Sequence, residues 1–187
     1  MDKQRCGWCI GDELYEAYHD EEWGLPVKDD STLFEFLLLE SFQAGLSWIT
    51  ILRKRENFRE AFDQFDYQKI AAYDQTKKDS LLQNAGIIRN RLKINSAVSN
   101  AQAFMKIQED YGSFSSYIWS FVDHKPIKNE VVNYKEAPAT TAISDAISKD
   151  LKKKGFKFVG STIVYAFMQA TGMVNDHETT CFRYNEV

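Results

Sequence analysis

Four residues near the two ends of the chain have the chemistry of metal ligands. Cys6 and His19 lie near the N-terminus, and His177 and Cys181 lie four residues apart near the C-terminus. On a helical turn, an i,i+4 pair projects from one face and can bind one metal ion. Two cysteines and two histidines form the closed tetrahedral donor set of a structural Zn²⁺. The alternative is a buried thiol with surface histidines.

If one zinc ion binds per chain, it ties the two ends together and stabilises a loop of nearly the whole sequence. Protein atoms then fill all four positions, which disfavours metal-assisted hydrolysis of a small molecule. Cys9 is the spare thiol, and we expect it to be a small core residue. Three cysteines are an odd count, more typical of metal ligands or buried thiols in a cytoplasmic protein than of disulfides.

Glu40 directly follows the apolar run 36–39. A carboxylate beside an apolar helix face is destabilised by desolvation unless it is paired or used, and the alternative is that it turns outward at the helix end. Several aromatic residues occur in neighbouring motifs, namely Tyr15, Tyr18, Trp23 and Trp48. Aromatic walls with one buried carboxylate suit a flipped nucleobase, preferably a cationic one. The alternative for these aromatics is core packing, which we favour for Trp23.

Segment 81–89 joins two expected helices through a turn at Gly86, and Arg89, Arg91 and Lys93 follow. Such a helix-hairpin-helix directs backbone N–H groups at a phosphate. A second basic stretch includes Lys157 and runs into a helix start at Ser161. Each charge run can also be a solvated helix face. Because the net charge is -4, any nucleic-acid contact must come from such local patches.

The elements that must position these residues show helical spacing, so we expect an all-α protein with no strand pair. A capping box at Thr32–Glu35 predicts a buried helix that continues to about Phe42. Further helices are expected over 47–62, 66–72, 77–84, 90–107, 114–121, 144–154 and 161–171, with a long loop over 123–138. No linker or repeat divides residues 1–187. We expect no signal peptide and no membrane span, because apolar runs are far shorter than the roughly 20 residues required.

A set of motifs carries a resemblance that covers nearly the whole chain. They are residues 5–8 (RCGW), 14–24 (LYEAYHDEEWG), 43–50 (QAGLSWIT), 54–57 (KREN), 84–89 (NAGIIR), 155–160 (GFKFVG) and 174–177 (VNDH). With these motifs the chain resembles the 3-methyladenine DNA glycosylase I family of the helix-hairpin-helix superfamily. The resemblance implies a helical core over about 30–170, with 1–29 and 171–187 forming a zinc-stapled lobe.

The resemblance also implies roles for individual residues. Glu40 would read the base in the pocket and is the candidate catalytic residue. The zinc ligands would be Cys6, His19, His177 and Cys181, and the base would be contacted by Tyr15, Tyr18 and Trp48. The residues that enter the DNA stack would be Gln43, Gly45 and Leu46. The DNA backbone would be bound by Gly86 with Arg89, and also by Lys157 and Ser161.

The implied reaction is hydrolysis of the N-glycosidic bond of 3-methyladenine in alkylated double-stranded DNA, with 3-methylguanine as a further candidate. Free 3-methyladenine would be the product, and we expect a monomer. Segment 89–109 contains no Asp, which most helix-hairpin-helix glycosylases use as an acid but which this family is similar in lacking. The hairpin turn contains no Lys, so no lyase step is expected.

The chain departs from the family pattern at Glu13, where Pro is expected, and in its short tail after Cys181, but neither touches a named site. Three rival functions remain at this point. They are a non-catalytic DNA-binding module, a zinc hydrolase of small molecules, and a glycosylase with another lesion preference.

Overall fold

The computed structural model describes residues 3–187. Its helices are α1 (Glu13–Glu21), α2 (Asp30–Gln43), α3 (Trp48–Ala61), α4 (Tyr67–Ala71), α5 (Gln75–Gln83), α6 (Arg91–Tyr111), α7 (Phe114–Trp119), α8 (Ala142–Lys153) and α9 (Ser161–Ala170). Short 3-10 turns lie at Asp63–Phe65, Ser120–Val122, Tyr134–Glu136 and Phe182–Asn185, and two short strands are β1 (Ile127–Lys128) and β2 (Val174–Asn175). The expectation of a mostly helical fold is confirmed.

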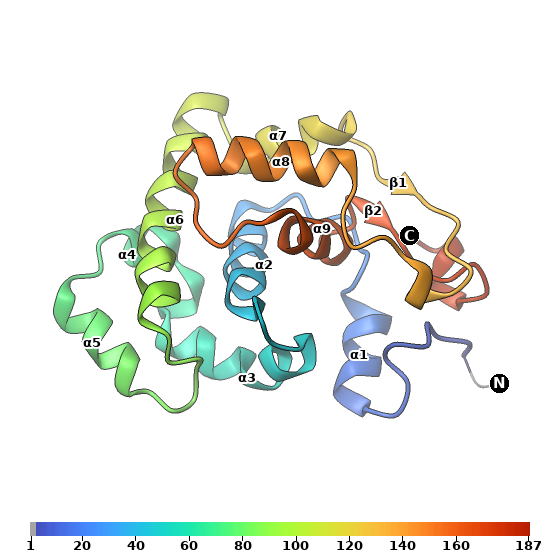
Figure 1. The fold of residues 1–187 in the computed structure, drawn as a ribbon, viewed down its shortest axis with the longest axis horizontal. Coiled ribbons are helices and arrows are strands. Elements are labelled where there is room, and N and C mark those ends of the chain that lie inside the picture. Colours follow the sequence, from blue (N-terminus) through green and yellow to red (C-terminus); the bar gives the residue numbers. More distant parts are fainter. Residues whose placement is uncertain (1–2) are drawn as a thin grey trace.

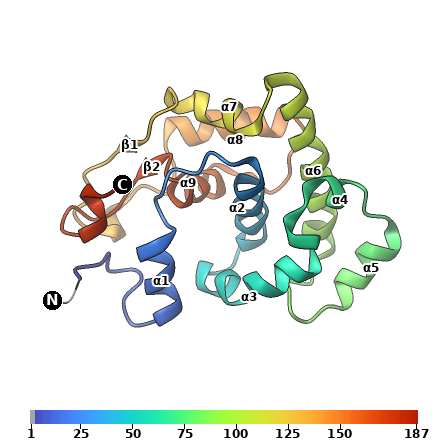
Figure 2. The same ribbon diagram turned by 180° about the vertical axis from the view of Figure 1, so that it is seen from behind.

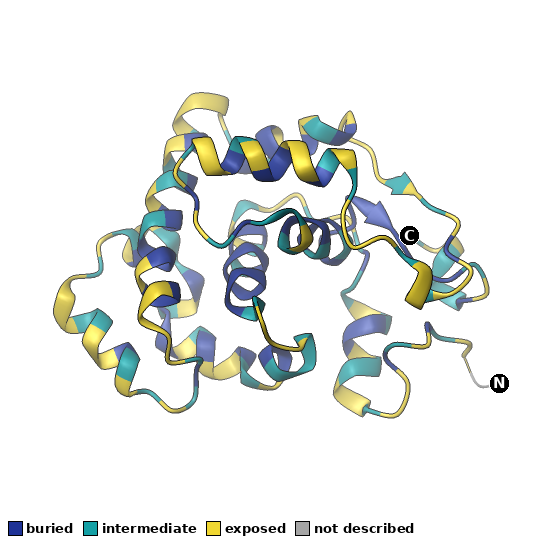
Figure 3. Ribbon diagram, viewed as in Figure 1, coloured by how far each residue is buried: buried dark blue, intermediate teal, exposed yellow. Residues whose placement is uncertain are grey.

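Helix α2 lies at the centre of the molecule, and Figures 1 and 2 show the other long helices arranged around it. It packs against α9, α3, α6 and α7. Its residues are buried without interruption from Phe36 to Phe42 (Figure 3), including Glu40. A helix that is apolar on nearly every side is stable only in such a position, as the sequence predicted.

The start of α2 differs from the prediction. Asp29, and not Thr32, is the N-cap, because an Asp29 carboxylate oxygen accepts hydrogen bonds from the Thr32 backbone N–H and hydroxyl, both at 2.8 Å. Both residue types cap helices well, and the earlier one extends the helix by most of a turn. The chain does contain a capping box, but at the start of α8, where Thr141 and Ser144 bond reciprocally.

Helix α1 and the strands β1 and β2 were also not expected from the sequence. Helix α1 begins after Asp12, whose side chain accepts from the Tyr15 N–H. Strands β1 and β2 pair in parallel, with Ile127 opposite Val174, so the prediction of no strand pair was wrong. Each strand has only two residues, which is too short for the alternation by which strands are recognised in a sequence.

The two ends of the described chain lie on the same side of the molecule (Figure 1). The Phe182 N–H donates to the Gln4 carbonyl at 2.8 Å, which joins the N-terminal segment to the C-terminal one. This places the cysteine and histidine of each end close together. No helix within residues 3–187 combines the length and apolar character needed to cross a membrane.

A partly buried ion cluster links the first three helices to one another. The Arg55 guanidinium on α3 contacts Glu22, just after α1, at 2.7 Å and Glu35 on α2 at 2.6 Å. Arg55 is only 7% exposed and the Glu35 side chain 14%, so solvent screens the contact between these two weakly. The three helices that supply Tyr18, Glu40 and Trp48 are thereby held in one arrangement.

Gly172, between α9 and β2, has no room for a side chain. Its φ is +68°, and an added Cβ would lie 2.4 Å from the Leu25 backbone carbon and 2.5 Å from the Pro26 nitrogen. We expect Gly172→Ala to lower the free energy of unfolding by about 2–5 kcal/mol, since backbone strain and overpacking add. Gly112→Ala is the matched control, with φ +84° and open space, and should cost about 1 kcal/mol. Equal losses in urea denaturation would contradict the close approach.

Candidate active site

The four predicted metal ligands lie together and are all buried. Their ligand atoms lie within 4.8 Å of one another. The Cys181 sulfur is 3.4 Å from Nε2 of His19 and 3.7 Å from Nδ1 of His177, which in turn is 3.6 Å from the Cys6 sulfur. Metal–ligand bonds of about 2.0–2.3 Å at tetrahedral angles place sulfur and nitrogen about 3.6 Å apart. The cluster is therefore preorganised to hold one metal ion.

The outer nitrogens of both histidines also have partners. Nδ1 of His19 lies 2.9 Å from the Asp20 carboxylate, and Nε2 of His177 lies 3.2 Å from the Trp23 carbonyl. Such partners fix the tautomer and leave the opposite nitrogen facing the metal. Without a metal, contact with the Cys6 thiol and with the two histidines lowers the pKa of Cys181, which favours the thiolate that metals bind.

His177 and Cys181 do not lie on one face of a helix, as the i,i+4 spacing suggested. They lie in the irregular segment between β2 and the 3-10 turn at Phe182–Asn185. The Cys181 N–H donates to the Glu178 carbonyl at 2.7 Å, and this tight turn brings the two side chains together without a helix. The expected pairing is right, but its local structure is not.

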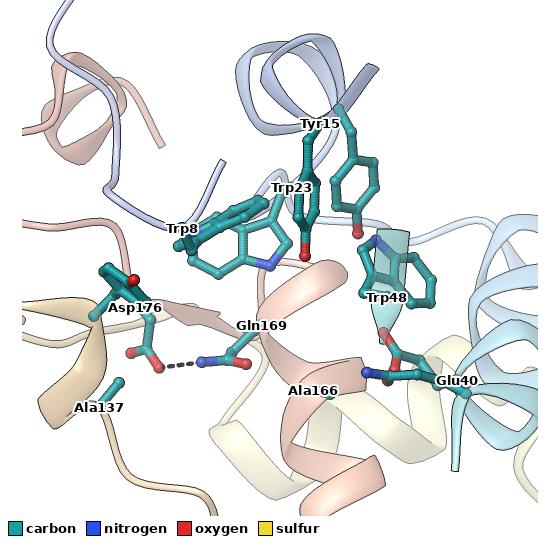
Figure 4. A pocket seen from close by; sticks show the side chains of 12 residues that line it. Trp8, Tyr15, Trp23, Glu40, Trp48, Ala137, Ala166, Gln169 and Asp176 are labelled. Carbon is teal, nitrogen blue, oxygen red and sulfur yellow. Dashed lines mark hydrogen bonds between the residues drawn. The ribbon is translucent and has the colours of Figure 1, made fainter. Parts of the chain in front are cut away.

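A cavity of about 240 Å³ lies between the first helices and the C-terminal segment. It exceeds the roughly 150 Å³ cavity that admits benzene in another protein. Glu40 and Trp48 lie on one side, and Gln169 with Asp176 lies on the other (Figure 4). Its lining residues are Trp8, Tyr15, Tyr18, Trp23, Glu40, Gln43, Trp48, Tyr134, Ala137, Ala166, Gln169 and Asp176.

Three polar atoms of the cavity wall are buried without a partner. They are one carboxylate oxygen of Glu40, the Tyr18 hydroxyl and the indole N–H of Trp48, and within residues 3–187 nothing hydrogen-bonds to them. Leaving such atoms unsatisfied costs free energy. Together they offer an acceptor, a hydroxyl and a donor to a planar ligand that has its own N–H groups and ring nitrogens.

Burial changes the protonation of the cavity. Desolvation raises the pKa of Glu40 well above its usual value, because burial removes the water that would stabilise the charged carboxylate. Desolvation also raises the pKa of Tyr15 to about 12, with smaller contributions from Cys9 and Glu40. The cavity wall therefore disfavours negative charge and would favour a ligand that donates N–H groups or carries positive charge.

The aromatic side of the cavity packs directly against the cluster of Cys6, His19, His177 and Cys181. The Trp23 ring stacks on His19, with centroids 6.2 Å apart, and meets His177 edge-on at 4.6 Å. Trp8 contacts His19 at 5.4 Å and Trp23 at 5.0 Å. Two of the metal ligands thus support two of the rings that enclose the cavity.

Comparisons with known proteins agree with this geometry. The methyladenine glycosylase family model matches residues 8–184. DNA-3-methyladenine glycosylase 1 of Escherichia coli (strain K12) is 51% identical over 181 residues, which are 97% of either chain. A crystal structure of a 3-methyladenine DNA glycosylase I has a TM-score of 0.93 at 53% identity, covering 96% of this chain and 98% of that one. The chain belongs to the methyladenine glycosylase family.

A second similar structure is that of a variant 3-methyladenine DNA glycosylase I in complex with 3-methyladenine. It has a TM-score of 0.92 at 38% identity and covers 95% of this chain and 96% of that one. These matches confirm the family resemblance that the motifs indicated, and they confirm it over nearly the whole methyladenine glycosylase chain.

The segment expected to enter the DNA stack forms a tight turn between α2 and α3. Gln43 lines the cavity, whereas Gly45 and Leu46 are exposed. The Leu46 N–H donates to the Gln43 carbonyl at 2.6 Å, and φ of Gly45 is +82°, which is the geometry of a type II turn. The turn thus reaches from the cavity to the surface, although its DNA contact stays a prediction.

The other predicted DNA contacts lie apart from the cavity. Arg89 is exposed beside the hairpin, but the Gly86 N–H donates to the Asn84 side chain at 2.8 Å and so has a partner within the protein. Lys157 is exposed, while the Ser161 hydroxyl lies 2.8 Å from that of Ser144 at the start of α8. Their roles remain predictions.

Sequence reasoning missed several cavity residues of this methyladenine glycosylase. Trp23, for which we favoured core packing, lines the cavity, and so does Trp8. A signal existed for both, because Trp8 is close in sequence to Cys6 and Trp23 is close to His19. If those two ligands meet in one cluster, the two rings lie near each other. Tyr134 and Gln169 carried no such signal, since a long loop and an unremarkable helix bring them to the cavity.

Substitution of one predicted metal ligand should have a different effect from substitution of the nearby thiol of Cys9. We expect His177→Ala to abolish stoichiometric metal binding and to lower the free energy of unfolding by at least about 3 kcal/mol. Cys9→Ala is the matched control, because Cys9 is buried near the cluster but is not a member of it. Elemental analysis after gel filtration measures the metal. Equal metal content in both variants would contradict the assigned ligand set.

Glu40 should lower the stability of the methyladenine glycosylase as pH rises. Because its folded pKa is raised, stability is full below the unfolded value of about 4.3 and is lost as pH rises toward the folded pKa. We expect Glu40→Gln to be more stable than wild type at pH 8, with the difference vanishing near pH 4. The exposed Glu60→Gln should match wild type throughout. A destabilised Glu40→Gln at pH 8 would show that the carboxylate has a stabilising partner.

Proposed function

We propose that this methyladenine glycosylase hydrolyses the N-glycosidic bond of 3-methyladenine in alkylated double-stranded DNA, with the base bound in the Glu40 cavity. The observation that carries the proposal is the set of three unpartnered polar atoms in an aromatic cavity. A flipped purine supplies both the flat faces and the edge groups that this wall lacks. The related structure in complex with 3-methyladenine supports this choice of ligand.

Glu40 recognises the edge of the base. Its carboxylate accepts a hydrogen bond from the exocyclic amino group, which replaces the water lost on burial. Tyr18 and Trp48, whose rings are 5.6 Å apart, contact the same base through a ring face or a polar atom. Alkylation at N3 gives adenine in DNA a positive charge, so Glu40 attracts the lesion more strongly than it attracts neutral adenine.

The positive charge also weakens the bond that is cut. The C1′–N9 bond breaks with its electron pair going to the base, which leaves as neutral 3-methyladenine. Water adds to the cationic sugar carbon and loses a proton. Because the leaving group needs no protonation, the absence of the acid Asp found in other helix-hairpin-helix enzymes is not a chemical deficit. Glu40 contributes base binding and electrostatic stabilisation and is not assigned as a general base.

The same proposal assigns the DNA contacts. The turn at Gln43, Gly45 and Leu46 fills the gap that the flipped base leaves in the DNA stack, and the hairpin with Arg89 binds the DNA backbone. Lys157 and the start of α9 at Ser161 extend the contact. Because the net charge is -4, binding depends on these local groups and weakens modestly with salt.

The reaction ends with base release. Among the described residues that line the cavity there is no lysine, so no amine lies there to form the imine of a lyase. 3-Methylguanine carries the same N3 charge and is a second candidate substrate.

Zinc fits the cluster best, because two thiolates and two imidazoles at tetrahedral distances form its usual structural donor set. Four protein ligands leave no open position, so the zinc supports the fold and takes no part in hydrolysis. We propose a monomer in which the metal-linked segments 1–29 and 171–187 support the helical core over about 30–170. Free ligand thiols fit the reducing cytoplasm.

Chromatography of the base released from alkylated duplex DNA tests the proposal. We expect Glu40→Gln to lower kcat/KM for 3-methyladenine release by about 10²-fold, because an amide keeps an acceptor but loses the charge. We also expect it to weaken binding of free 3-methyladenine about tenfold. Glu60→Gln should leave both unchanged.

Unchanged affinity of Glu40→Gln for 3-methyladenine would refute the role of Glu40. Failure of the wild-type protein to release any methylated purine would refute the function itself.

A further inference from the structure

Lys93 is a buried amine that the proposed reaction does not use. It is only 6% exposed, and its ammonium group donates to the Phe42 and Ala44 carbonyls, both at 2.7 Å. These two carbonyls lie on either side of Gln43, which lines the cavity. A lysine is rarely buried without such specific partners, because desolvation of its charge is costly.

The two carbonyls are those at which α2 ends and the turn toward α3 begins. Helix α2 carries no basic residue in its last turn, so Lys93 supplies the positive charge that stabilises the negative end of a helix. Ala44, with φ -44° and ψ 114°, already has the turn conformation. Lys93 therefore holds the point at which the chain leaves the cavity wall and turns to the exposed Leu46.

Lys93 is also tied to the hairpin. It lies in the first turn of α6, and its own backbone N–H donates to the side chain of Asn90, the N-cap, at 3.1 Å. The hairpin residues 84–89 immediately precede Asn90. One side chain thus connects the hairpin end of α6 to the turn at Gln43–Leu46.

We propose that Lys93 is a positioning residue that sets the Gln43–Leu46 turn relative to the hairpin, so that Leu46 enters the DNA stack as the base leaves. The inference rests on the proposed function. Because the ammonium group is buried on two carbonyls, Lys93 does not bind phosphate itself. It acts on the step that separates the base from its neighbours, and Gln43 is the lining residue of the cavity that its two carbonyl contacts adjoin.

The test compares one lesion in two contexts. An oligonucleotide containing 3-methyladenine is offered as a fully paired duplex and as the single strand, in which unstacking costs least. We expect Lys93→Met, which keeps the length but loses the N–H donors, to lower the ratio of duplex to single-strand excision about ten- to hundredfold. Affinity for free 3-methyladenine should stay within about twofold, because Lys93 makes no hydrogen bond to Glu40, Tyr18 or Trp48, which we assign to base binding.

Lys106→Met on the same helix is the matched control, since Lys106 is exposed and pairs with Glu109 and Asp110, its neighbours on the helix. It removes the same charge and should leave the ratio unchanged.

The slope of log affinity for DNA against log salt should be equal in wild type and Lys93→Met, whereas loss of a phosphate contact would reduce it by about 1. If Lys93→Met does not fold, the shorter and uncharged Lys93→Gln tests the same ratio.

Equal losses on duplex and single strand, lost affinity for the free base, or a reduced salt slope would each overturn the role of Lys93 while leaving the glycosylase activity in place. Failure of the proposed function is distinguishable, because the wild-type protein would then release no 3-methyladenine from either substrate.

Discussion

The burial of the Glu40 carboxyl group beside an aromatic-walled cavity, with no ion pair to it within residues 3–187, is the constraint on which the rest of this structure depends. Glu40 can remain there only because α2 is packed on all sides and cannot rotate to expose it. The ion cluster around Arg55 then fixes the helices that bring Tyr18 and Trp48 to the same cavity. The Glu40 carboxyl group thus lacks a hydrogen-bond partner at a place where a ligand can provide one. Groups with perturbed pKa values are common in binding sites for this reason.

The four predicted metal ligands support the side of the cavity that faces away from Glu40. The two histidines among them contact Trp23 and Trp8, while the adjacent Asp176 accepts hydrogen bonds from Tyr165 and Gln169. The C-terminal segment, far from α2 in the sequence, becomes part of the cavity by this route. The four-residue cluster, which can hold a metal ion, and the cavity therefore share the rings of Trp8 and Trp23.

The sequence predicted those features that depend on residue type and local pattern. The apolar run before Glu40 predicted a buried helix, and the four ligand residues predicted a cluster that joins the ends. The cap at Asp29 was missed because two capping residues compete within one turn, and the pairing of β1 with β2 was missed because two residues carry no period. Tyr134 and Gln169 could not be predicted, since only tertiary packing brings them to the cavity.

Carbon-13 NMR of the side-chain carboxyl of Glu40, assigned by its loss in Glu40→Gln, tests the central claim most directly. The account predicts that this carboxyl titrates above its usual range in the free protein, because burial disfavours the charge. Saturation with 3-methyladenine should lower that pKa, since N–H donation from the base favours the carboxylate. An ordinary titration in the free protein, or one that the base leaves unmoved, would contradict it.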